Sequence, residues 1–389
     1  MTIGIDARFY GTLGKGLGRY TQRLIEYIEP LDRENQYVIF LRRENWEEYT
    51  PRFSNFRKVL APYSWYGFSE QIFFPFLIWK EGIDLMHFPH FNVPILCPAP
   101  LVVTIHDLIL LDFPTPRATA LGPVIYKIKE AVYHIVIRMA IWRAKRVITI
   151  SEYTKKRLMA YFRRSENKIA VIYQSGRVNI CQEGPGRASG KNDSSRDIIR
   201  PYFLYVGNAY PHKNLEGLLR AYKVFVHKNG FTHQLVLVGK MDYFYEGVKK
   251  LAGELGLLES PDGVSPVIFR GQVSDCELCF IYRSAFCYVF PSFVEGFGLP
   301  PLEAMNYGIP VLSSNRSCLP EILGDGALFF DPGNEAEFVE SLIRISQDDL
   351  LRTDLVEKGY RTTQKYSWEK FARETLGVYQ KEIPPQPSL

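Results

Sequence analysis

Short runs rich in Val, Ile and Phe alternate with longer amphipathic segments from one end of this chain to the other. This alternation is typical of parallel β-sheets whose two faces are covered by helices. A single hydrophobic core rarely grows beyond about 250 residues, whereas the chain has 389. The sequence therefore predicts an α/β protein with two domains.

Twelve of the apolar runs are predicted strands, six in each half. Those of the first half are Ile3–Ala7, Tyr37–Leu41, Asp84–Phe88, Leu101–His106, Arg146–Ser151 and Ile169–Tyr173. Those of the second half are Tyr202–Gly207, Gln234–Gly239, Val267–Arg270, Cys287–Pro291, Ile309–Ser313 and Ala327–Phe330. Residues 177–200 between them are rich in Gly, Ser, Asn and charge without periodicity, as linkers are. We expect domains over residues 1–180 and 201–369, a linker over 181–200, and a final helix near 370–382 that packs back toward the first domain.

Charge and targeting signals narrow the class of protein. The 47 basic and 42 acidic residues leave a formal net charge of +5, a smaller excess than dedicated nucleic-acid binders carry. The N-terminus leads straight into an apolar strand without the features of a secretory signal. No uncharged apolar run reaches the roughly 18 residues that a membrane-spanning helix needs. We therefore expect a cytoplasmic protein with no nucleic-acid partner. Its cysteines are expected to be reduced. The pair Cys276-x-x-Cys279 is not a predicted zinc site, because no further zinc ligands lie at suitable spacing.

One basic segment leaves two interpretations open. Residues 123–146 mix Ile, Val and Tyr with several Lys and Arg, as an amphipathic helix lying on an anionic membrane would. The same pattern fits a helix packed on a sheet whose Lys and Arg reach out to water, which we favour. Aromatic residues earlier in the first domain suit either a membrane interface or a core; they are Trp65, Phe73, Phe74, Phe76 and Trp79. A peripheral contact with the inner face of the membrane is therefore an open alternative.

The most informative stretch is 291–305, which reads PSFVEGFGLPPLEAM. A buried strand ends there, Gly296 and Gly298 let the backbone come close to a ligand, and Pro300 or Pro301 begins a helix. Backbone N–H groups and the positive end of the helix dipole would then meet at one place, stabilising an anion by about 0.3 to 1 kcal/mol. The stretch predicts a binding site for a diphosphate.

Glu295 and Glu303 flank this predicted anion site. A carboxylate beside a phosphate is unfavourable unless it has another task, such as accepting hydrogen bonds from sugar hydroxyls. The alternative is structural, with Glu295 a loop carboxylate and Glu303 a charge in the first helical turn that suits the dipole. The surrounding Gly-x-Gly-x-Pro-Pro loop favours recognition of a sugar.

Two glutamates separated by seven residues, in the setting Glu-Gly-Phe-Gly-Leu-Pro-Pro-Leu-Glu-Ala-Met, resemble a family signature. The family is the retaining nucleotide-sugar glycosyltransferases of the GT-B fold, group 1 or family four, which includes many bacterial mannosyltransferases. The resemblance implies two Rossmann-like domains with parallel sheets facing a central cleft. It implies that Glu295 approaches the donor sugar's hydroxyls and that Glu303 holds the ribose. By the same resemblance, the donor's sugar and phosphate meet the backbone of Gly296, Phe297, Gly298 and Leu299.

Residues 205–215 resemble the first strand and loop of the family's donor domain, in which a lysine holds the diphosphate. That role falls to Lys213, and Asn208 stands where some members carry a further basic residue. Independently of the resemblance, Lys213 follows a strand and precedes Asn214, a plausible N-cap, so that cation and helix start could meet on one phosphate. A plain surface lysine is the alternative.

Further candidates lie elsewhere in the chain. Residues 14–18, GKGLG, follow the opening strand as glycine-rich phosphate turns do. The family resemblance implies that Gly16 faces the donor, that Val273 contacts the nucleotide base, and that His106 lines the acceptor side near the reacting carbon. His87 and His90 are assigned only to the acceptor side.

The predicted chemistry needs no cofactor. No Asp-x-Asp element is present, so we expect no metal ion, and Lys213 with helix N–H groups would neutralise the leaving diphosphate. Glu295, Lys213 and His106 form the predicted catalytic set. We expect retention of anomeric configuration, with attack from the face that the diphosphate leaves.

The predicted function is transfer of a hexose from a nucleotide-sugar donor to a glycan or lipid-linked glycan acceptor. Resemblance to O-antigen-type enzymes suggests mannose from GDP-mannose, while UDP-sugars stay open. The alternatives are a nucleotide-sugar epimerase or phosphorylase on the same architecture, and a non-catalytic nucleotide-sugar-binding partner. A nicotinamide dehydrogenase is less consistent with the sequence, because the first domain lacks the expected ribose-binding acid.

Overall fold

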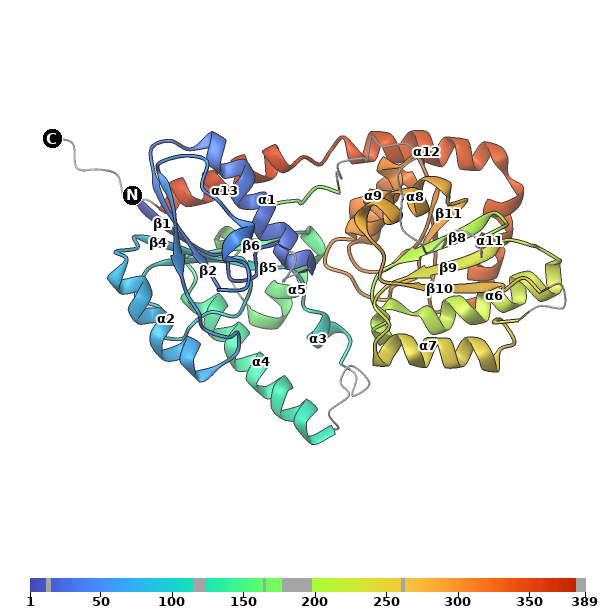
Figure 1. The fold of residues 1–389 in the computed structure, drawn as a ribbon, viewed down its shortest axis with the longest axis horizontal. Helices are drawn as coiled ribbons and strands as arrows, with labels where there is room; N and C mark the ends of the chain where they lie inside the picture. Colours follow the sequence, from blue (N-terminus) through green and yellow to red (C-terminus); the bar gives the residue numbers. More distant parts are fainter. Residues whose placement is uncertain (12–14, 115–122, 164–165, 177–197, 260–262, 383–389) are drawn as a thin grey trace. The chain divides into compact units, whose positions relative to one another are not determined.

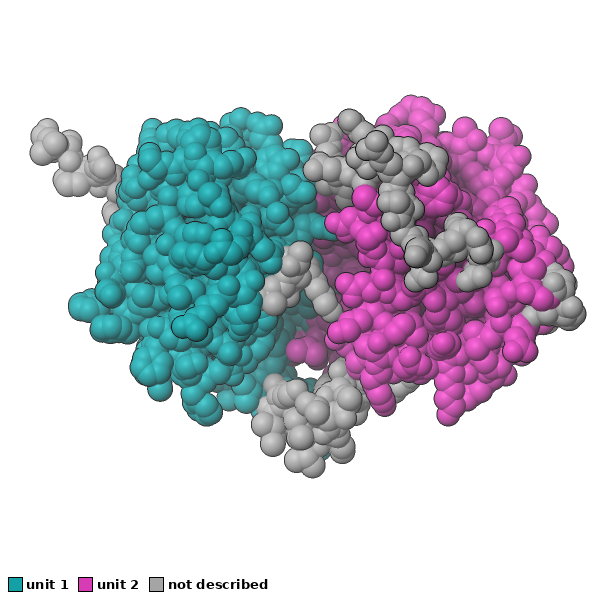
Figure 2. All heavy atoms as spheres, viewed as in Figure 1, with its two compact units in different colours: residues 1–108, 121–174, 367–389 teal, residues 109–120, 175–366 magenta. Residues whose placement is uncertain are grey.

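The computed structural model describes residues 1–11, 15–114, 123–163, 166–176, 198–259 and 263–382 (Figure 1). The chain divides into two compact units, coloured separately in Figure 2. Unit 1 comprises residues 1–108, 121–174 and 367–389, and unit 2 comprises residues 109–120 and 175–366. Most of the predicted linker over 181–200 lies outside the described residues.

Unit 1 contains a seven-stranded sheet in the order β3-β2-β1-β4-β5-β6-β7, with every neighbouring pair parallel. Its strands are β1 (Thr2–Asp6), β2 (Gln36–Leu41), β3 (Phe56–Leu60), β4 (Leu85–Phe88), β5 (Leu101–Ile105), β6 (Arg146–Thr149) and β7 (Ile169–Val171). Its helices are α1 (Lys15–Leu31), η2 (Trp46–Glu48), α2 (Phe68–Lys80), α4 (Pro123–Arg143), α5 (Glu152–Phe162), η4 (Glu166–Lys168) and α13 (Trp368–Glu382).

Unit 2 contains a six-stranded parallel sheet in the order β10-β9-β8-β11-β12-β13. Its strands are β8 (Tyr202–Val206), β9 (Gln234–Val238), β10 (Val267–Gly271), β11 (Cys287–Phe290), β12 (Val311–Ser314) and β13 (Ala327–Phe330). Its helices are α3 (Ile109–Asp112), η5 (Pro211–Lys213), α6 (Leu215–Asn229), α7 (Tyr243–Glu254), α8 (Asp275–Ser284), α9 (Leu299–Asn306), α10 (Leu319–Leu323), η6 (Gly324–Gly326), α11 (Glu335–Gln347) and α12 (Asp349–Thr363).

Continuous apolar runs explain the central strands. Every residue of β9 and β11 is buried, because helices cover both faces of a parallel sheet and leave no face for alternating polar residues. All twelve predicted strands are present, and the predicted α/β class is confirmed. In both sheets the first strand lies beside the fourth, where the order of strands reverses. Open α/β sheets bind ligands at the carboxyl ends of the strands beside such a reversal.

Strand β3 is absent from the prediction. Only Phe56 of this strand is buried, while Arg57 is exposed and Lys58 is half-buried. β3 lies at the end of the sheet order and pairs with β2. An edge strand needs less apolar surface than a central strand, so its sequence carried too weak a signal.

Helix α13 belongs to unit 1, where it packs beside α1 (Figure 1). The Tyr379 hydroxyl lies 2.6 Å from His87 Nδ1, and the ring of Phe371 meets the edge of Tyr20 at 4.9 Å between centroids. At the end of the helix, Glu382 pairs with Arg146 at 2.5 Å. The final helix is thus joined to the sheet of unit 1 by apolar, polar and ionic contacts.

The aromatic run around α2 divides between two environments. Phe74 is fully buried, and its ring lies under the Arg8 guanidinium at 4.3 Å. Phe73, Phe76 and Trp79 each expose more than half of their surface. Burial in a core therefore accounts for Phe74 and not for these three. In the described part of the chain, no helix is long and apolar enough to cross a bilayer.

Candidate functional site

The loops after β8 and β11 meet at the strand reversal of unit 2. The backbone N–H of Phe293 donates to the carbonyl of His212 at 2.8 Å. Beside this link, Lys213 Nζ lies 2.5 Å from Glu295 Oε1. These two predicted residues are 82 positions apart in the chain, and the parallel neighbours β8 and β11 bring them together.

The Lys213–Glu295 pair is largely withdrawn from water. The Lys213 and Glu295 side chains are only 14% and 9% exposed. The ammonium also faces the ring of Phe290, the last residue of β11, at 5.5 Å from its centroid. Charges in such a setting interact more strongly than on an open surface. The Lys213 ammonium is therefore a cation that could interact strongly with an anionic ligand.

Asn214 occupies the predicted N-cap position of α6 but does not act as a side-chain cap. Its backbone is left-handed, with φ 57°, and its side chain makes no capping hydrogen bond. The Nδ2 group donates instead to the Pro332 carbonyl at 3.2 Å. Asn214 is thus the N-cap residue of α6, as predicted, but its side chain fixes the end of the Lys213 loop and does not cap the helix.

The loop after β11 turns into α9 at Gly298, as predicted. Gly298 has φ 95°, a conformation that residues with a side chain rarely adopt. A Cβ placed there would lie 2.9 Å from Leu319 Cδ2. Pro300 and Pro301 are the second and third residues of α9, and proline has no N–H. The backbone donors at this helix start are therefore those of the loop and of Leu299.

Replacing Gly298 with alanine should lower the melting temperature and weaken binding of the donor. The strained backbone costs about 1 to 3 kcal/mol, and relief of the contact with Leu319 shifts the loop that carries Glu295. Differential scanning fluorimetry with and without nucleotide measures both effects. Gly247→Ala is the control, because a Cβ there meets nothing within 4 Å. Equal effects of the two substitutions would refute the assigned role of Gly298.

Glu303 is buried at the core side of α9. It is the fifth residue of the helix and only 7% exposed, so its expected place in the first turn is wrong. The Tyr282 hydroxyl donates to Glu303 Oε2 at 3.5 Å. A dipole-stabilising role does not account for a buried second-turn carboxylate, so the structural interpretation of Glu303 as a first-turn charge does not hold.

The loop after β12 holds Glu295 through two residues that the sequence did not single out for this role. The backbone N–H of Glu295 donates to Ser317 Oγ at 3.0 Å. The Cys318 thiol donates to the Glu295 carbonyl at 3.2 Å. The adjacency of β11 and β12 brings these two residues beside Glu295.

Asn208, Val273 and Lys213 all follow strands of unit 2 at the same edge of its sheet. Asn208 is exposed after β8, and its side chain accepts from the Tyr210 N–H at 3.4 Å. Val273 is half-buried two residues after β10. The predicted donor-binding residues of this unit therefore lie at the same edge of the sheet, beyond the carboxyl ends of β8, β10 and β11.

His212 beside Lys213 is held neutral. Burial, and then the charge of Lys213, lowers the pKa of His212 to about 4. Aromatic rings surround this position, because Phe113 stacks on Phe293 at 5.7 Å and meets His212 at 6.5 Å. At neutral pH the cationic charge at this point is therefore that of Lys213.

In unit 1, His106 follows β5, and one of its ring nitrogens is already hydrogen-bonded within the protein. Its Nε2 lies 2.7 Å from the Pro89 carbonyl, and a carbonyl can only accept, so Nε2 carries the proton. Burial lowers the pKa of His106 to about 4, which the bond to Pro89 partly offsets. At neutral pH the ring is uncharged, and Nδ1 is its basic nitrogen.

The other first-domain candidates differ in access. Gly16 is exposed in the first turn of α1, and a Cβ there would meet nothing within 4 Å.

His87 has no exposed surface, and both of its ring nitrogens are hydrogen-bonded, one to the Tyr379 hydroxyl and the other to the Thr104 hydroxyl at 2.9 Å. Its pKa falls to about 3 through burial and the charge of His106. His87 therefore stabilises unit 1 and does not line an acceptor site. His90 is half-buried, with its ring 4.0 Å from that of Phe91.

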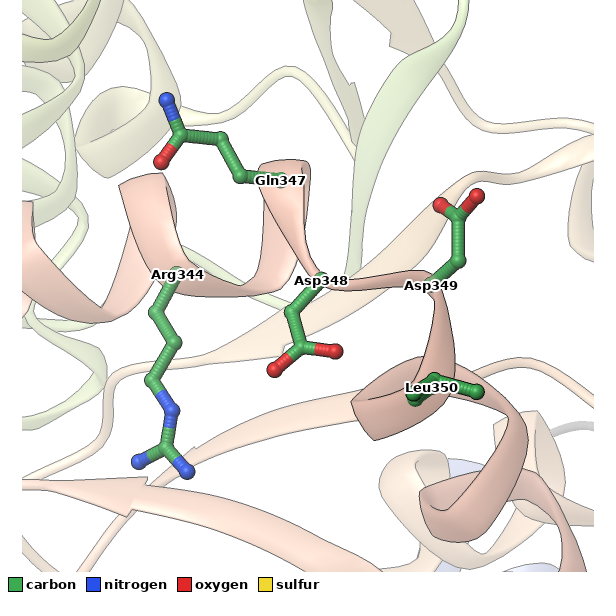
Figure 3. Close-up of a pocket in the computed structure, with 5 residues that line it drawn as sticks. All are labelled: Arg344, Gln347, Asp348, Asp349 and Leu350. Carbon is green, nitrogen blue, oxygen red and sulfur yellow. The ribbon is translucent and has the colours of Figure 1, made fainter.

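A separate shallow pocket lies where α11 meets α12 (Figure 3). It is lined by Arg344, Gln347, Asp348, Asp349 and Leu350. None of the predicted site residues lines it. Among the described residues, no group of three or more His, Cys, Asp or Glu is arranged to hold a metal ion.

Two family models match consecutive parts of the chain. The model described as glycosyl transferases group 1 matches residues 191–362, and the model described as glycosyltransferase family 4 matches residues 14–175. Between them they contain every residue of the predicted site.

Similar proteins agree with these matches. O-antigen chain mannosyltransferase B of Escherichia coli is 27% identical over 76% of this chain and 74% of its own. O-antigen chain mannosyltransferase RfbU of Salmonella typhimurium is 29% identical over 74% of this chain and 72% of its own. HepE of Anabaena, solved in complex with UDP and glucose, has a TM-score of 0.70 and 15% identity over 97% of this chain and 99% of its own. The chain belongs to the group 1 glycosyltransferases of the GT-B fold and is a hexosyltransferase.

Proposed function

We propose that the protein transfers mannose from GDP-mannose to a glycan, with retention of configuration and without a metal ion. The contact between Lys213 and Glu295 at the strand reversal of unit 2 is the observation that carries this proposal. The choice of mannose is supported by the names of the two O-antigen chain relatives. HepE was solved with UDP and glucose, so a UDP-sugar is the competing donor.

The roles of the two side chains follow from their charges. The Lys213 ammonium would neutralise the departing diphosphate, a task that a preorganised cation performs without further rearrangement of solvent. Glu295 would accept hydrogen bonds from hydroxyls of the donor sugar. Because the two groups pair with each other at 2.5 Å, donor binding must exchange this contact for one from each group to the donor.

For the acceptor, we propose a glycan or lipid-linked glycan, as the O-antigen names of the relatives suggest. Attack from the face that the diphosphate leaves would give retention, with a leaving phosphate oxygen taking the acceptor's proton. The neutral His106 offers Nδ1 as a hydrogen-bond acceptor, which suits a hydroxyl of the acceptor or of the donor sugar.

A comparison of donors tests the proposal. We expect GDP-mannose and GDP to raise the melting temperature more than UDP-glucose and UDP, because a ligand that binds only the folded state stabilises it. Proton NMR of the glycoside formed should show the anomeric configuration of the donor, with rates unchanged by EDTA. Preference for UDP-sugars would overturn the choice of GDP-mannose, an inverted product would overturn retention, and loss of activity in EDTA would overturn the metal-independent mechanism. Incubation with donor alone, which an epimerase or phosphorylase would convert, is the control.

A further inference from the structure

Helix α2 has two apolar faces, and only one of them is covered. Phe74 and Ile78 are fully buried on the inner face. The outer face carries five large apolar side chains that are 54% to 89% exposed: Phe68, Ile72, Phe73, Phe76 and Trp79. Single exposed apolar residues are common on soluble proteins, but a contiguous group of this size marks a surface for binding.

The outer face of α2 carries no negative charge. Glu70 is the one acidic residue of the helix, and its side chain is fully buried against Arg8 at 2.5 Å and Asn92 at 2.7 Å. Lys80 is exposed in the last turn. A partner of this face would therefore meet apolar rings with a cation at one end.

Two further elements of unit 1 extend this surface. The backbone N–H of Ile95 donates to Gln71 of α2 at 2.9 Å, and Ile95 and Leu96 are exposed. Arg143, the last residue of α4, donates to the Cys97 carbonyl at 2.6 Å and also to that of Ile95. Figure 1 shows α2 and α4 in the lower part of unit 1.

Helix α4 exposes apolar and basic side chains together. Ile135 and Trp142 are 58% and 68% exposed, and Arg138 lies between them, exposed on the same side of the helix. Lys145 is exposed just beyond the helix. We call the outer residues of α2, together with Ile95, Leu96, Ile135 and Trp142, the α2 face.

We propose that the α2 face binds the surface of an anionic lipid bilayer. Aromatic rings suit the headgroup region, and lysine and arginine at the margin attract anionic lipids. A second copy of the chain would add its own Lys80 and Arg138 to the same interface without an exposed acidic group on α2 to balance them, whereas a bilayer with anionic lipids complements these cations. This membrane contact is separate from the donor site and is centred on α2, not on residues 123–146.

The position of α2 suggests what the membrane contact of the α2 face does for the enzyme. Glu70 in its first turn is bonded to Arg8, which follows β1 and pairs with Asp6 at 2.7 Å. The start of the α2 face is thus fixed to the carboxyl end of the unit 1 sheet, the edge at which β5 delivers His106. A lipid-borne acceptor at the bilayer surface would meet the protein near that edge.

Vesicle sedimentation of the full-length protein tests the proposal. We expect binding to vesicles of phosphatidylcholine with phosphatidylglycerol, and weaker binding to phosphatidylcholine alone. The variant Phe68→Ser/Phe76→Ser/Trp79→Ser should partition into the mixed vesicles at least about tenfold less, because it loses three large apolar groups. The matched control is Phe280→Ser/Leu350→Ser, which alters residues of unit 2 that are 50% and 84% exposed and should bind like wild type.

Two more measurements separate this proposal from others. Brominated lipids should quench the fluorescence of the wild type more than that of Trp79→Phe, and nucleotide-induced stabilisation should be the same in the triple variant and wild type. Equal sedimentation of the triple variant and wild type, or no binding to mixed vesicles, would overturn the proposal. A dimer seen by light scattering and abolished in the triple variant would instead assign the α2 face to a second copy. If the wild-type protein does not bind nucleotide, only the proposed function is contradicted, and the membrane proposal is unaffected.

Discussion

Replacing Lys213 with alanine should lower the turnover number for sugar transfer by about 10²- to 10³-fold, the usual effect of removing one preorganised stabiliser of transition-state charge. The ammonium lies at the strand reversal of unit 2, largely withdrawn from water, 2.5 Å from Glu295. His212 beside it has a pKa near 4 and supplies no replacement charge at neutral pH. Initial rates at saturating donor and acceptor measure the effect.

Glu295 gives this experiment a second arm. Glu295→Gln keeps the shape of the side chain but removes the charge that pairs with Lys213, so the variant should bind the free nucleoside diphosphate more tightly while transferring sugar more slowly. Lys250→Ala is the matched lysine control, because that side chain is 80% exposed on α7. Turnover of the Lys213 variant within about twofold of wild type would show that Lys213 does not stabilise the leaving group.

The two sheets were predictable because parallel strands with helices on both faces must be apolar throughout. β9, with sequence Gln-Leu-Val-Leu-Val, is fully buried and could be recognised from its sequence alone. β3 could not, because an edge strand with Arg57 and Lys58 in its centre resembles a loop. The strength of the sequence signal thus followed the number of faces that each strand buries.

The candidate site was predictable where the chemistry is local. The turn at Gly298 and the helix after it follow from glycine and proline within one short stretch. The bond from Glu295 to Ser317 depends on β12 lying beside β11, which is a property of the sheet. Asn214 shows the same limit, since its side chain bonds to Pro332, 118 residues away, in place of its own helix.

The two faces of α2 show why burial was harder to predict than secondary structure. Phe73 and Phe74 are neighbours of the same type, yet the first is 54% exposed and the second fully buried. A helix that is apolar on both sides gives no periodic signal for which side faces the core. The buried position of Glu70 is equally invisible in the sequence, because it depends on Arg8, 62 residues earlier.

Replacing Arg8 with methionine should destabilise the protein by about 3 to 5 kcal/mol, the usual cost of removing one partner from a buried ionic group. The Arg8 and Glu70 side chains are fully buried, and Asp6 is nearly so. Without the guanidinium, two carboxylates remain in the interior with no cation to balance them. Urea denaturation followed by circular dichroism measures the loss. Arg373→Met is the control, because its ion pair with Glu369 is exposed on both sides and is worth about 0 to 1 kcal/mol.

The stability lost on replacing Arg8 should depend on pH, and the pKa shift of Glu70 sets the direction of this dependence. Burial already raises the pKa of Glu70, and the charge of Arg8 is the largest influence opposing that rise. In the methionine variant the folded-state pKa of Glu70 rises further above its unfolded value, so the folded variant holds a proton that the unfolded chain releases as the pH increases. The stability of the variant should therefore be highest near the unfolded pKa of about 4.3 and fall toward pH 7. A difference from wild type that stays constant between pH 5 and pH 7 would mean that Glu70 does not take up the proton, and that the cost of losing Arg8 lies in packing against Phe74.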